Sequence, residues 1–337
     1  MRIGLTYDLR DDYHGLGLTE EQLAEFDSPE TIAAIAGALQ RRGHAVTRIG
    51  HIRALAARLV AGERWDLVFN ICEGLSGRSR EAQVPALLEA FGQPYTFADP
   101  LTMAVTLDKA VAKRLVRDAG LPTAPFAVLA SDADDAACRL AFPAFVKPLA
   151  EGTGKGCERA SKVRDAAALA TAARDLRARF GQPALAEAFL PGREFTVGIL
   201  GNGAGARVIA VMEIALAETA DEAIYSFESK ELCETRVVYT LADDAEARAA
   251  AETALAAYAV LGCRDAARLD LRSDARGVPH FLEANPVAGL HPTHSDLPML
   301  ATKAGLAYDA LIDGIVHAAA RRQGLGRLDH RLGAEAA

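Results

Sequence analysis

The stretch RLDLRSDARGVPHFLEAN, residues 268–285, governs the interpretation of the whole chain. It predicts two strands joined by a turn, because turn-forming residues separate two strand-like segments. Side chains two positions apart on a strand share a face, so Arg268 pairs with Asp270, and Glu283 with Asn285. Mg²⁺ binds oxygen ligands, commonly one or two carboxylates together with substrate phosphates. The pattern therefore favours a platform for Mg²⁺ and a nucleotide, and it leaves open a solvated hairpin with ordinary surface charges.

Composition limits the classes of protein to consider. The chain has 337 residues and a net charge of −8, so two or three domains are expected and nucleic-acid binding is not. We expect no membrane span, because no apolar stretch reaches roughly 18 residues, and no signal peptide, because the first residues lack an apolar core. The five cysteines are scattered without a C-x-x-C pair, which indicates reduced thiols and a cytoplasmic location.

The first hundred residues predict a parallel sheet covered by helices, because strand and helix patterns alternate along them. Ser28 and Pro29 form a helix start. Loops 8–27 and 70–74 follow strands of this sheet, where ligands of parallel sheets bind, so they are candidates for substrate contact or else ordinary crossover turns. The expected strands are 2–7, 45–49 and 66–70, and the expected helices 28–42, 54–61 and 81–91.

Two lysines and a glycine loop in the next part of the chain point to phosphate binding. Lys109 lies in the first turn of an amphipathic helix expected over 107–119, where a cation opposes the helix dipole. Lys147 ends a strand expected over 142–148, directly before the glycine-rich segment 151–156. Glycines let backbone amides approach an anion closely, although this segment has neither Walker A nor Rossmann spacing. A surface lysine and a hairpin turn are the alternatives.

The remaining pattern predicts an α+β C-terminal half. Asp243 is the expected N-cap of helix 244–261. His291 and His294 are three residues apart, but Pro292 between them disfavours a helical zinc site. We expect further strands at 184–190, 194–200 and 207–214, helices at 165–179 and 305–321, and polar segments at 226–232 and 289–298.

Taken together, these segments resemble the ATP-grasp superfamily, and most closely its D-alanine–D-alanine ligase group. Their order and spacing carry the resemblance, which covers most of the chain. It implies three domains: an N-terminal parallel-sheet α/β domain at 1–100, a central subdomain at 101–186 and a C-terminal subdomain at 187–325, followed by a polar tail at 326–337. ATP would lie between the last two. The matching segments are 107–109, 146–156 with 161–163, 187–197, 228–230, 268–270, 283–285 and 294–295.

The resemblance also implies roles for individual residues on the nucleotide side. Lysines would hold the ATP phosphates, a mobile glycine flap would cover them, a hinge segment would bind adenine and an acid would bind ribose. Three oxygen ligands would hold two Mg²⁺ ions, for which Mn²⁺ could substitute. These positions are Lys109, Lys147 and Lys230 for phosphates; Gly152, Thr153, Gly154 and Gly156 for the flap; Glu187, Ala188, Phe189 and Leu190 for adenine; Glu194 for ribose; and Asp270, Glu283 and Asn285 for the metal.

On the catalytic and substrate side the match is looser. By resemblance, Arg268 and Lys230 would stabilise the reacting groups, and Ser295 would hold the second substrate's carboxylate. Glu25 or Asp27 would take the place of the family's ammonium-binding acid. Glu73 stands where the family has a His-Gly segment, Glu231 replaces an expected tyrosine, and Gly289 and His294 belong to the polar loop before Ser295.

The implied reaction is amide-bond formation. A carboxylate attacks the γ-phosphate of ATP to give an acyl phosphate, and an amine then displaces phosphate. Because most departures fall on the substrate side, we hypothesise an ATP-dependent ligase of amino-acid-like carboxylate and amine substrates that differ from the family's usual pair. The alternatives are a D-alanine–D-alanine ligase itself and a non-catalytic nucleotide-binding protein. Related ligases are commonly dimers, so the resemblance is also compatible with a homodimer.

Overall fold

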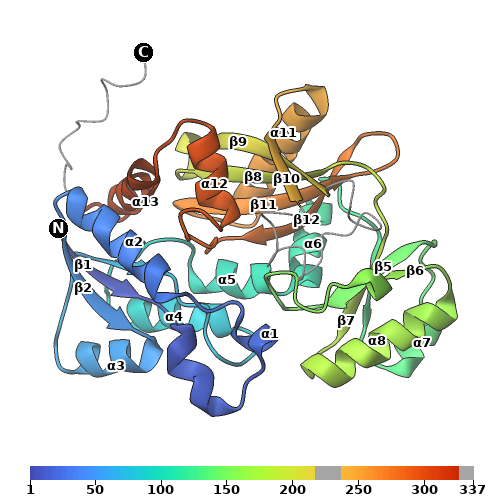
Figure 1. Cartoon of the computed structure of the whole chain (residues 1–337), viewed down its shortest axis with the longest axis horizontal. Helices are drawn as coiled ribbons and strands as arrows, with labels where there is room; N and C mark the ends of the chain where they lie inside the picture. The colour runs from blue at the N-terminus through green and yellow to red at the C-terminus, as the bar shows by residue number, and fades with distance from the viewer. Residues whose placement is uncertain (217–236, 326–337) are drawn as a thin grey trace.

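Three separate sheets organise the molecule in the computed structural model, which describes residues 1–216 and 237–325 (Figure 1). The first sheet is parallel, in the order β2-β1-β3. The other two are antiparallel, in the orders β4-β7-β5-β6 and β10-β9-β8-β11-β12. No helix within the described ranges is long and apolar enough to cross a membrane.

The N-terminal sheet confirms the predicted alternation of strands and helices. Its strands are β1 (Arg2–Thr6), β2 (Ala45–Gly50) and β3 (Leu67–Asn70). Ser28 caps α2 (Pro29–Arg41) by accepting from the Thr31 amide, as the Ser-Pro pair predicts. The loop 8–27 is more structured than expected, since it contains the 3₁₀ helix η1 (Arg10–Leu16) and helix α1 (Glu20–Leu23). The other elements here are α3 (Ile52–Val60), η2 (Arg80–Ala82) and α4 (Gln83–Ala90).

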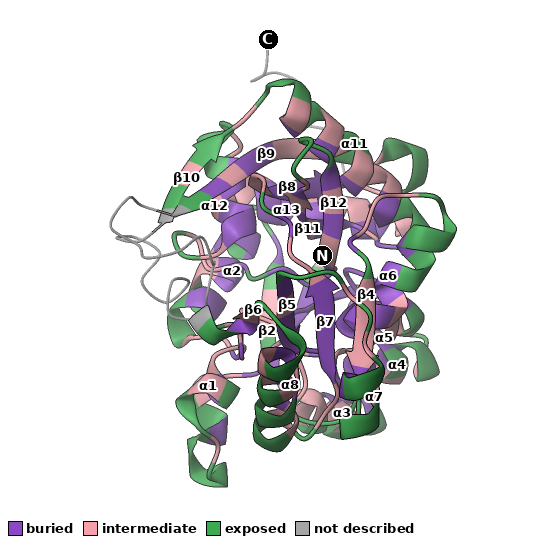
Figure 2. Cartoon of the chain, turned by 90° about the vertical axis from the view of Figure 1, so that its right-hand side faces the viewer, coloured by how far each residue is buried: buried purple, intermediate pink, exposed green. Residues whose placement is uncertain are grey.

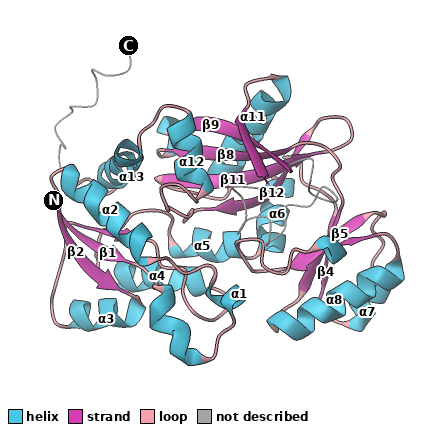
Figure 3. Ribbon diagram, in the orientation of Figure 1, coloured by secondary structure: helices cyan, strands magenta, loops and turns pink. Residues whose placement is uncertain are grey.

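The central sheet carries the predicted lysine strand, β5 (Ala144–Pro148), and the hinge strand, β7 (Ala184–Ala188), as antiparallel neighbours. In Figure 3 two helices lie together along this sheet, α7 (Asp132–Ala137) and α8 (Ala166–Phe180). The two outer strands are β4 (Phe126–Leu129) and β6 (Lys162–Val163). Strand β4 and helix α7 were absent from the sequence expectations.

The C-terminal sheet confirms the predicted hairpin. Strands β11 (Ala266–Ser273) and β12 (Pro279–Asn285) pair antiparallel, with Arg268 opposite Asn285 and Asp270 opposite Glu283. The intervening residues of β11, including Leu269 and Leu271, are fully buried, which gives the hairpin one core face and one polar face. Figure 2 colours the chain by burial and shows β7 of the neighbouring central sheet as mostly buried. The sheet also contains β8 (Glu194–Leu200), β9 (Arg207–Leu216) and β10 (Val237–Leu241).

Helices pack against this sheet and connect it to the rest of the molecule. Helix α6 (Lys109–Asp118) contributes Ala112 and Val116 to the same hydrophobic cluster as β8 and β11. Its first residue, Lys109, therefore lies close to the polar face of the hairpin. The other helices are α5 (Pro100–Leu107), α11 (Ala245–Val260), α12 (Asp296–Lys303) and α13 (Tyr308–Arg322).

Three local expectations were wrong in detail. The helix expected over 107–119 is α6, but it begins only at Lys109, because Leu107 ends α5 and Asp108 adopts an extended conformation and caps α6. The cap of α11 is Asp244 instead of Asp243, since Asp244 accepts from the amides of Glu246 and Ala247. The polar segment 289–298 also contains the start of α12, which the sequence expectations omit.

Candidate active site

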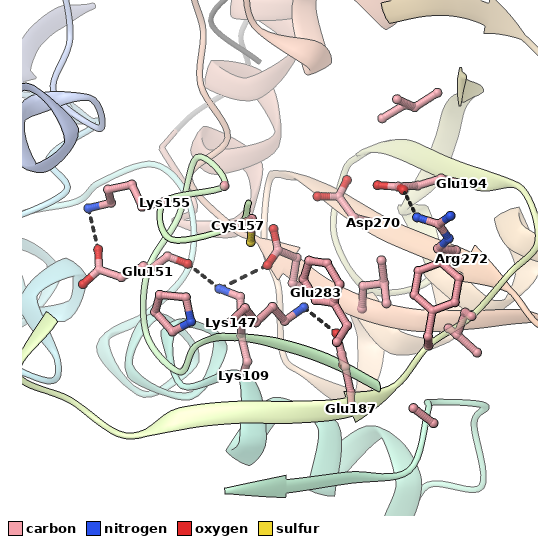
Figure 4. Close-up of a pocket in the computed structure, with 18 of the residues that line it drawn as sticks. Lys109, Lys147, Glu151, Lys155, Cys157, Glu187, Glu194, Asp270, Arg272 and Glu283 are labelled. Atoms are coloured by element: carbon pink, nitrogen blue, oxygen red, sulfur yellow. Dashed lines mark hydrogen bonds and ion pairs between the residues drawn. The ribbon is translucent and has the colours of Figure 1, made fainter. Parts of the chain in front are cut away.

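Two adjoining pockets share Lys109, Glu151, Glu283 and Asp296 in their linings. The first lies between the central and C-terminal sheets (Figure 4), and the second is also lined by residues of the N-terminal region. The pockets bring together nearly all described residues that the sequence singled out. The first contains Lys109, Lys147, Gly154, Glu187, Ala188, Phe189, Leu190, Glu194, Asp270 and Glu283. The second contains Glu25, Asp27, Glu73, Lys109, Gly152, Thr153, Arg268, Glu283, Asn285, Gly289, His294 and Ser295.

A buried carboxylate joined to two lysines lies at one end of the first pocket. Glu187, near the end of β7, places one oxygen 2.7 Å from Lys147 Nζ and the other 2.9 Å from Lys113 Nζ. Burial acts to raise the pKa of Glu187, but the two ammonium groups outweigh it and lower the pKa to about 2. The same carboxylate raises the pKa of Lys147, against the effect of burial. Glu187 and Lys147 are therefore charged at neutral pH, whereas burial lowers the pKa of Lys113 and the Glu187 carboxylate acts against that lowering.

The predicted ribose acid is paired with an arginine on the hairpin. Arg272 lies two residues after Asp270 on the same strand face and donates to Glu194 across 2.9 Å. Its guanidinium also lies 5.1 Å from the centre of the Phe189 ring, and Lys162 Nζ lies 4.0 Å from the same centre. Cations this close to an aromatic ring are attracted to it. The wall of the pocket around Glu194 is thus held in place by charge as well as by packing.

The polar face of the hairpin collects the predicted metal ligands and cations. Asp270 accepts from the Thr196 hydroxyl at 2.8 Å and from Arg268 at 3.0 Å. Glu283 lies opposite Asp270, with Lys109 Nζ 3.1 Å from its carboxylate. The Asn285 amide nitrogen lies 3.4 Å from Asp270.

This donor set fits Mg²⁺, because two carboxylates and an amide oxygen leave further positions for phosphate and water. Cations of the protein already lie against both carboxylates, Arg268 on Asp270 and Lys109 on Glu283. Within the described residues, no three His, Cys, Asp or Glu side chains are grouped as a metal site, so a bound ion would depend on ligands from the nucleotide.

The glycine loop donates backbone amides to carboxylates of the N-terminal region. The Gly152 amide donates to Glu25 at 2.7 Å, and the Gly156 amide donates to Glu21 at 3.0 Å. Thr153, Gly154 and Gly156 have positive φ angles, a backbone conformation that glycine adopts at low cost. The loop is therefore shaped to bind anions, and in this structure the anions are side chains of α1 and of the residues after it. Gly156 lies in the loop outside both pocket linings.

Four buried charges tie this loop to the N-terminal region. Arg80 lies 3.1 Å from Glu25 and 3.5 Å from Glu151, and Lys155 lies 3.0 Å from Glu25 and also pairs with Glu151. Burial acts to raise the pKa of Glu25, but the two cations and the Gly152 amide lower it overall. Glu25, the first candidate for binding a substrate ammonium, is thus neutralised by the protein's own cations.

Other carboxylates in the substrate-side pocket have raised pKa values. Burial and the neighbouring Asp8 raise the pKa of Asp27 to about 8. Burial and nearby acids also raise the pKa of Glu73 well above its usual value, and burial raises the pKa of Glu81 to about 7 despite Arg80. Acids in such surroundings gain a proton or a cationic ligand at neutral pH, so this wall suits a substrate's amino group.

The loop after the hairpin holds the predicted serine close to its backbone. The Ser295 hydroxyl accepts from the His291 amide at 3.0 Å. The rings of His291 and His294 are 6.0 Å apart between centres and nearly perpendicular. A side chain at Gly289 would come within 2.7 Å of the Ser295 hydroxyl oxygen. Gly289 is therefore needed to leave room for Ser295.

Sequence reasoning missed several charged residues at this site. Lys113 follows Lys109 by four positions on an amphipathic helix, and Arg272 follows Asp270 by two on a strand, so both spacings could have indicated them. Arg80 had no such local signal, because its partners Glu25 and Glu151 lie far away in the sequence. Lys155 pairs with Glu151 four residues before it, but nothing local indicated its contact with Glu25. The predicted residues Lys230 and Glu231 lie outside the described residues.

Similarity to known proteins agrees with this geometry. The family model described as the D-ala D-ala ligase C-terminus matches residues 115–317. The D-alanine–D-alanine ligase of Gluconobacter oxydans is 36% identical over 293 residues, covering 85% of this chain and 91% of that protein. The uncharacterized protein y4sG of Sinorhizobium fredii is 36% identical over 262 residues, covering 76% and 75%.

Solved structures give the same result for the fold. The D-alanine–D-alanine ligase of Bacillus anthracis superposes with a TM-score of 0.74 at 22% identity, covering 96% of this chain and 99% of that one. The same ligase complexed with ATP gives a TM-score of 0.72 at 21% identity, covering 96% and 98%. The fold is therefore ATP-grasp, and the protein is an ATP-dependent ligase that forms C–N bonds. The chain belongs to the D-alanine–D-alanine ligase family.

Proposed function

We propose that this ligase joins an amino-acid-like carboxylate to an amino-acid-like amine through an acyl phosphate. The observation that carries the proposal is the junction of the two pockets, where Lys109, Arg268, Asp270, Glu283 and Asn285 meet on the polar face of the hairpin. Cations and oxygen ligands concentrated at one point suit a phosphoryl group passing from a nucleotide to a carboxylate. The first pocket then holds the nucleotide that donates the phosphoryl group, and the second holds the substrates.

In this proposal the first pocket binds ATP between the central and C-terminal sheets. Glu187 and the backbone of 188–190 contact adenine, Phe189 and Leu190 form apolar walls, and Glu194 binds the ribose. Lys109 and Lys147 hold phosphates, and the glycine loop 152–156 closes over them. Lys230 retains its expected role at the γ-phosphate as a prediction from the sequence alone. The assignments of Lys109, Lys147, Gly154, Glu187, Glu194 and residues 188–190 are supported by their shared lining of the first pocket.

We further propose that Asp270, Glu283 and Asn285 hold Mg²⁺, or Mn²⁺ in its place, in two ions with the nucleotide phosphates. When bound, the metal neutralises charge on the transferring phosphoryl group. Arg268 is placed to stabilise negative charge next to it, since its guanidinium already bridges Asp270 and Asp296. Ser295 and Gly289 shape the binding position for the amine substrate's carboxylate.

For the substrates, we propose a pair other than two D-alanines. The support is local: Arg80 and Lys155 neutralise Glu25, and Glu73 lies where the family has its His-Gly segment. Asp27, Glu73 and Glu81 remain as candidate partners for an amino group, alongside the predicted contacts of Glu231 and His294. D-alanyl-D-alanine synthesis is the second candidate, favoured by relatives that carry that name.

Other expectations remain proposals. A domain boundary near residue 100 is supported by the separation of the N-terminal sheet from the other two. The expected boundary at 186 falls inside β7, a strand of the central sheet, so a boundary between β7 and β8 is proposed in its place. A homodimer and a cytoplasmic location are predictions from the resemblance and the cysteine pattern, and light scattering of the purified protein tests the first.

The deciding experiment measures ADP release that depends on amino acids, with Mg²⁺, over D- and L-amino acids singly and in pairs. Asp270→Ala serves as the inactive control. Turnover with another carboxylate–amine pair and none with D-alanine alone supports the proposal. Turnover with D-alanine alone makes the protein a dipeptide ligase of the usual kind. Bound ATP without stimulation by any pair favours the non-catalytic alternative.

A further inference from the structure

Lys113 is a fully buried cation whose hydrogen-bonding capacity is used completely. Its relative exposure is 0%. Its ammonium lies 2.9 Å from a Glu187 oxygen, 2.9 Å from the Thr123 hydroxyl and 3.1 Å from the Phe281 carbonyl. An ammonium has three donors, so these three acceptors fix its position. Burying a lysine this deeply is costly, and the contact with Glu187 indicates what the charge is used for.

Lys113 has no direct access to a bound nucleotide. It lies outside the set of described residues that line the first pocket, whereas Lys147 and Glu187 both belong to that set. Each oxygen of Glu187 contacts one of the two lysines. Lys113 therefore acts on the pocket through Glu187, from the side away from the nucleotide.

In the proposed function, Lys147 and Lys113 respond differently to the binding of ATP. A triphosphate attracts Lys147, which the proposal assigns to the phosphates, away from Glu187. A buried carboxylate that loses its only cation gains a proton or destabilises the site. Glu187 has a second cation, which the triphosphate cannot reach. The charge of Glu187 is thus maintained while Lys147 changes partner.

We propose that Lys113 is a positioning residue that keeps Glu187 an oriented anion for recognition of adenine while Lys147 is engaged by the triphosphate. This inference rests on the proposed roles of Glu187 and Lys147. An ionised carboxylate only accepts hydrogen bonds. Adenine presents an amino group at the position where guanine presents a carbonyl oxygen. The anionic form of Glu187 therefore selects ATP over GTP, and a protonated form does not.

The test is calorimetric binding of Mg-ATP and Mg-GTP to the full chain near pH 7, in buffers of different ionisation enthalpy. The buffer dependence measures the protons taken up on binding. Lys113→Met removes the cation while keeping an apolar stem, and Lys303→Met is the matched control, since Lys303 is exposed on α12. We expect Lys113→Met to weaken ATP binding about ten- to hundredfold, the range for a charge-assisted hydrogen bond. We also expect the Lys113→Met variant to take up more protons than wild type when it binds ATP, and to discriminate less strongly against GTP.

The inference is overturned if Lys113→Met binds ATP more weakly but shows the same proton uptake and the same ATP-to-GTP preference as wild type, because Lys113 is then merely structural. It is also overturned if Lys113→Met binds both nucleotides as Lys303→Met does. If Lys113→Met does not fold, Thr123→Val tests the same point. It keeps the cation but removes one of its three acceptors, and reduced preference for ATP over GTP is expected. A preference equal to wild type overturns the inference. These binding measurements are independent of amino-acid-dependent ADP release, so loss of the proposed ligase activity is distinguishable.

Discussion

Lys109 Nζ lies 3.1 Å from a carboxylate oxygen of Glu283, although the two residues come from a helix and a strand 174 positions apart. One is the proposed phosphate ligand and the other a proposed metal ligand. Their pairing keeps both charges compensated before nucleotide and Mg²⁺ arrive. The same relation holds between Arg268 and Asp270 at 3.0 Å. The charged side chains of the site are thus already arranged in oppositely charged pairs before ligands bind.

Glu283→Gln should abolish most Mg²⁺-dependent turnover, because it removes one of two carboxylates proposed to hold the metal. We expect a decrease of about a hundredfold or more in kcat, since electrostatic groups at a transfer site contribute several kcal/mol. The measurement is ADP release against Mg²⁺ concentration. The required Mg²⁺ concentration should rise as well. A variant with an unchanged Mg²⁺ requirement contradicts the metal assignment, and Glu252→Gln on α11 is a control away from both pockets.

Arg272→Met should raise the KM for ATP about three- to tenfold and leave kcat nearly unchanged. Arg272 orients Glu194 at 2.9 Å and lies 5.1 Å from the centre of the Phe189 ring, so its loss frees two walls of the nucleotide pocket. Hydrogen bonds to charged groups contribute about 1.5–3 kcal/mol and cation–π contacts about 0.5–2 kcal/mol, and only part of this reaches the nucleotide through the two walls. Steady-state kinetics over ATP concentration separates the two constants. Arg272→Lys keeps the charge and should be intermediate, whereas an equal KM in all three proteins shows that Arg272 has no part in binding.

Arg80→Met should destabilise the protein by about 3–5 kcal/mol, because it leaves Glu25 and Glu151 with a single cation in a buried site. Its melting temperature should fall clearly below that of wild type. Arg78→Met is the matched control. Its side chain is 77% exposed and pairs with Asp108, whose carboxylate keeps its hydrogen bonds to the first turn of α6 when Arg78 is removed, so the loss should be much smaller than for Arg80. Equal melting temperatures for the two variants mean that the loop is not held by this network.

The hairpin and its site were predictable because their signal is local. Alternation on β11 and β12 places Arg268 and Asp270 opposite Asn285 and Glu283, and the register confirms it. The N-terminal sheet was likewise predictable from alternating strands and helices.

The network around Glu25 was not predictable in this way. The Gly152 amide that donates to Glu25 is 127 residues away. Neither hydrophobic periodicity nor a helix-capping pattern in the sequence indicates a contact over such a distance. Helix α12 was missed for another reason, since Pro298 and several polar residues lie in and before its first turn. Tertiary packing overrode that local signal, with Leu297 and Leu300 buried in the fold.

Asp27→Asn should stabilise the protein increasingly as pH rises from 5 to 8. The folded-state pKa of Asp27 is raised from 3.8 to about 8 by burial and Asp8. A raised folded pKa means that stability is complete below the unfolded value and is lost as pH rises through the folded value. The loss is at most about 1.4 kcal/mol per pH unit. Melting temperatures of both proteins over this range provide the test. The exposed Asp118→Asn on α6 is the control, and parallel curves for Asp27→Asn and wild type contradict the assigned shift.

Gly289→Ala should impair binding of the amine substrate without affecting ATP. The added methyl group would lie 2.7 Å from the Ser295 hydroxyl oxygen and 3.3 Å from its Cβ, so the serine must move and lose its contact with the His291 amide. Misplacing a substrate-positioning group by about 1 Å can cost about a hundredfold. We therefore expect the KM of the amine to rise at least tenfold, with the KM for ATP within twofold of wild type.

Gly205→Ala is the control, because a methyl group there meets no atom within 4 Å. If both variants bind the amine equally well, Ser295 lies outside its binding position. If Gly289→Ala weakens ATP and amine binding together, the loop is required for the fold of the whole site instead of for one substrate.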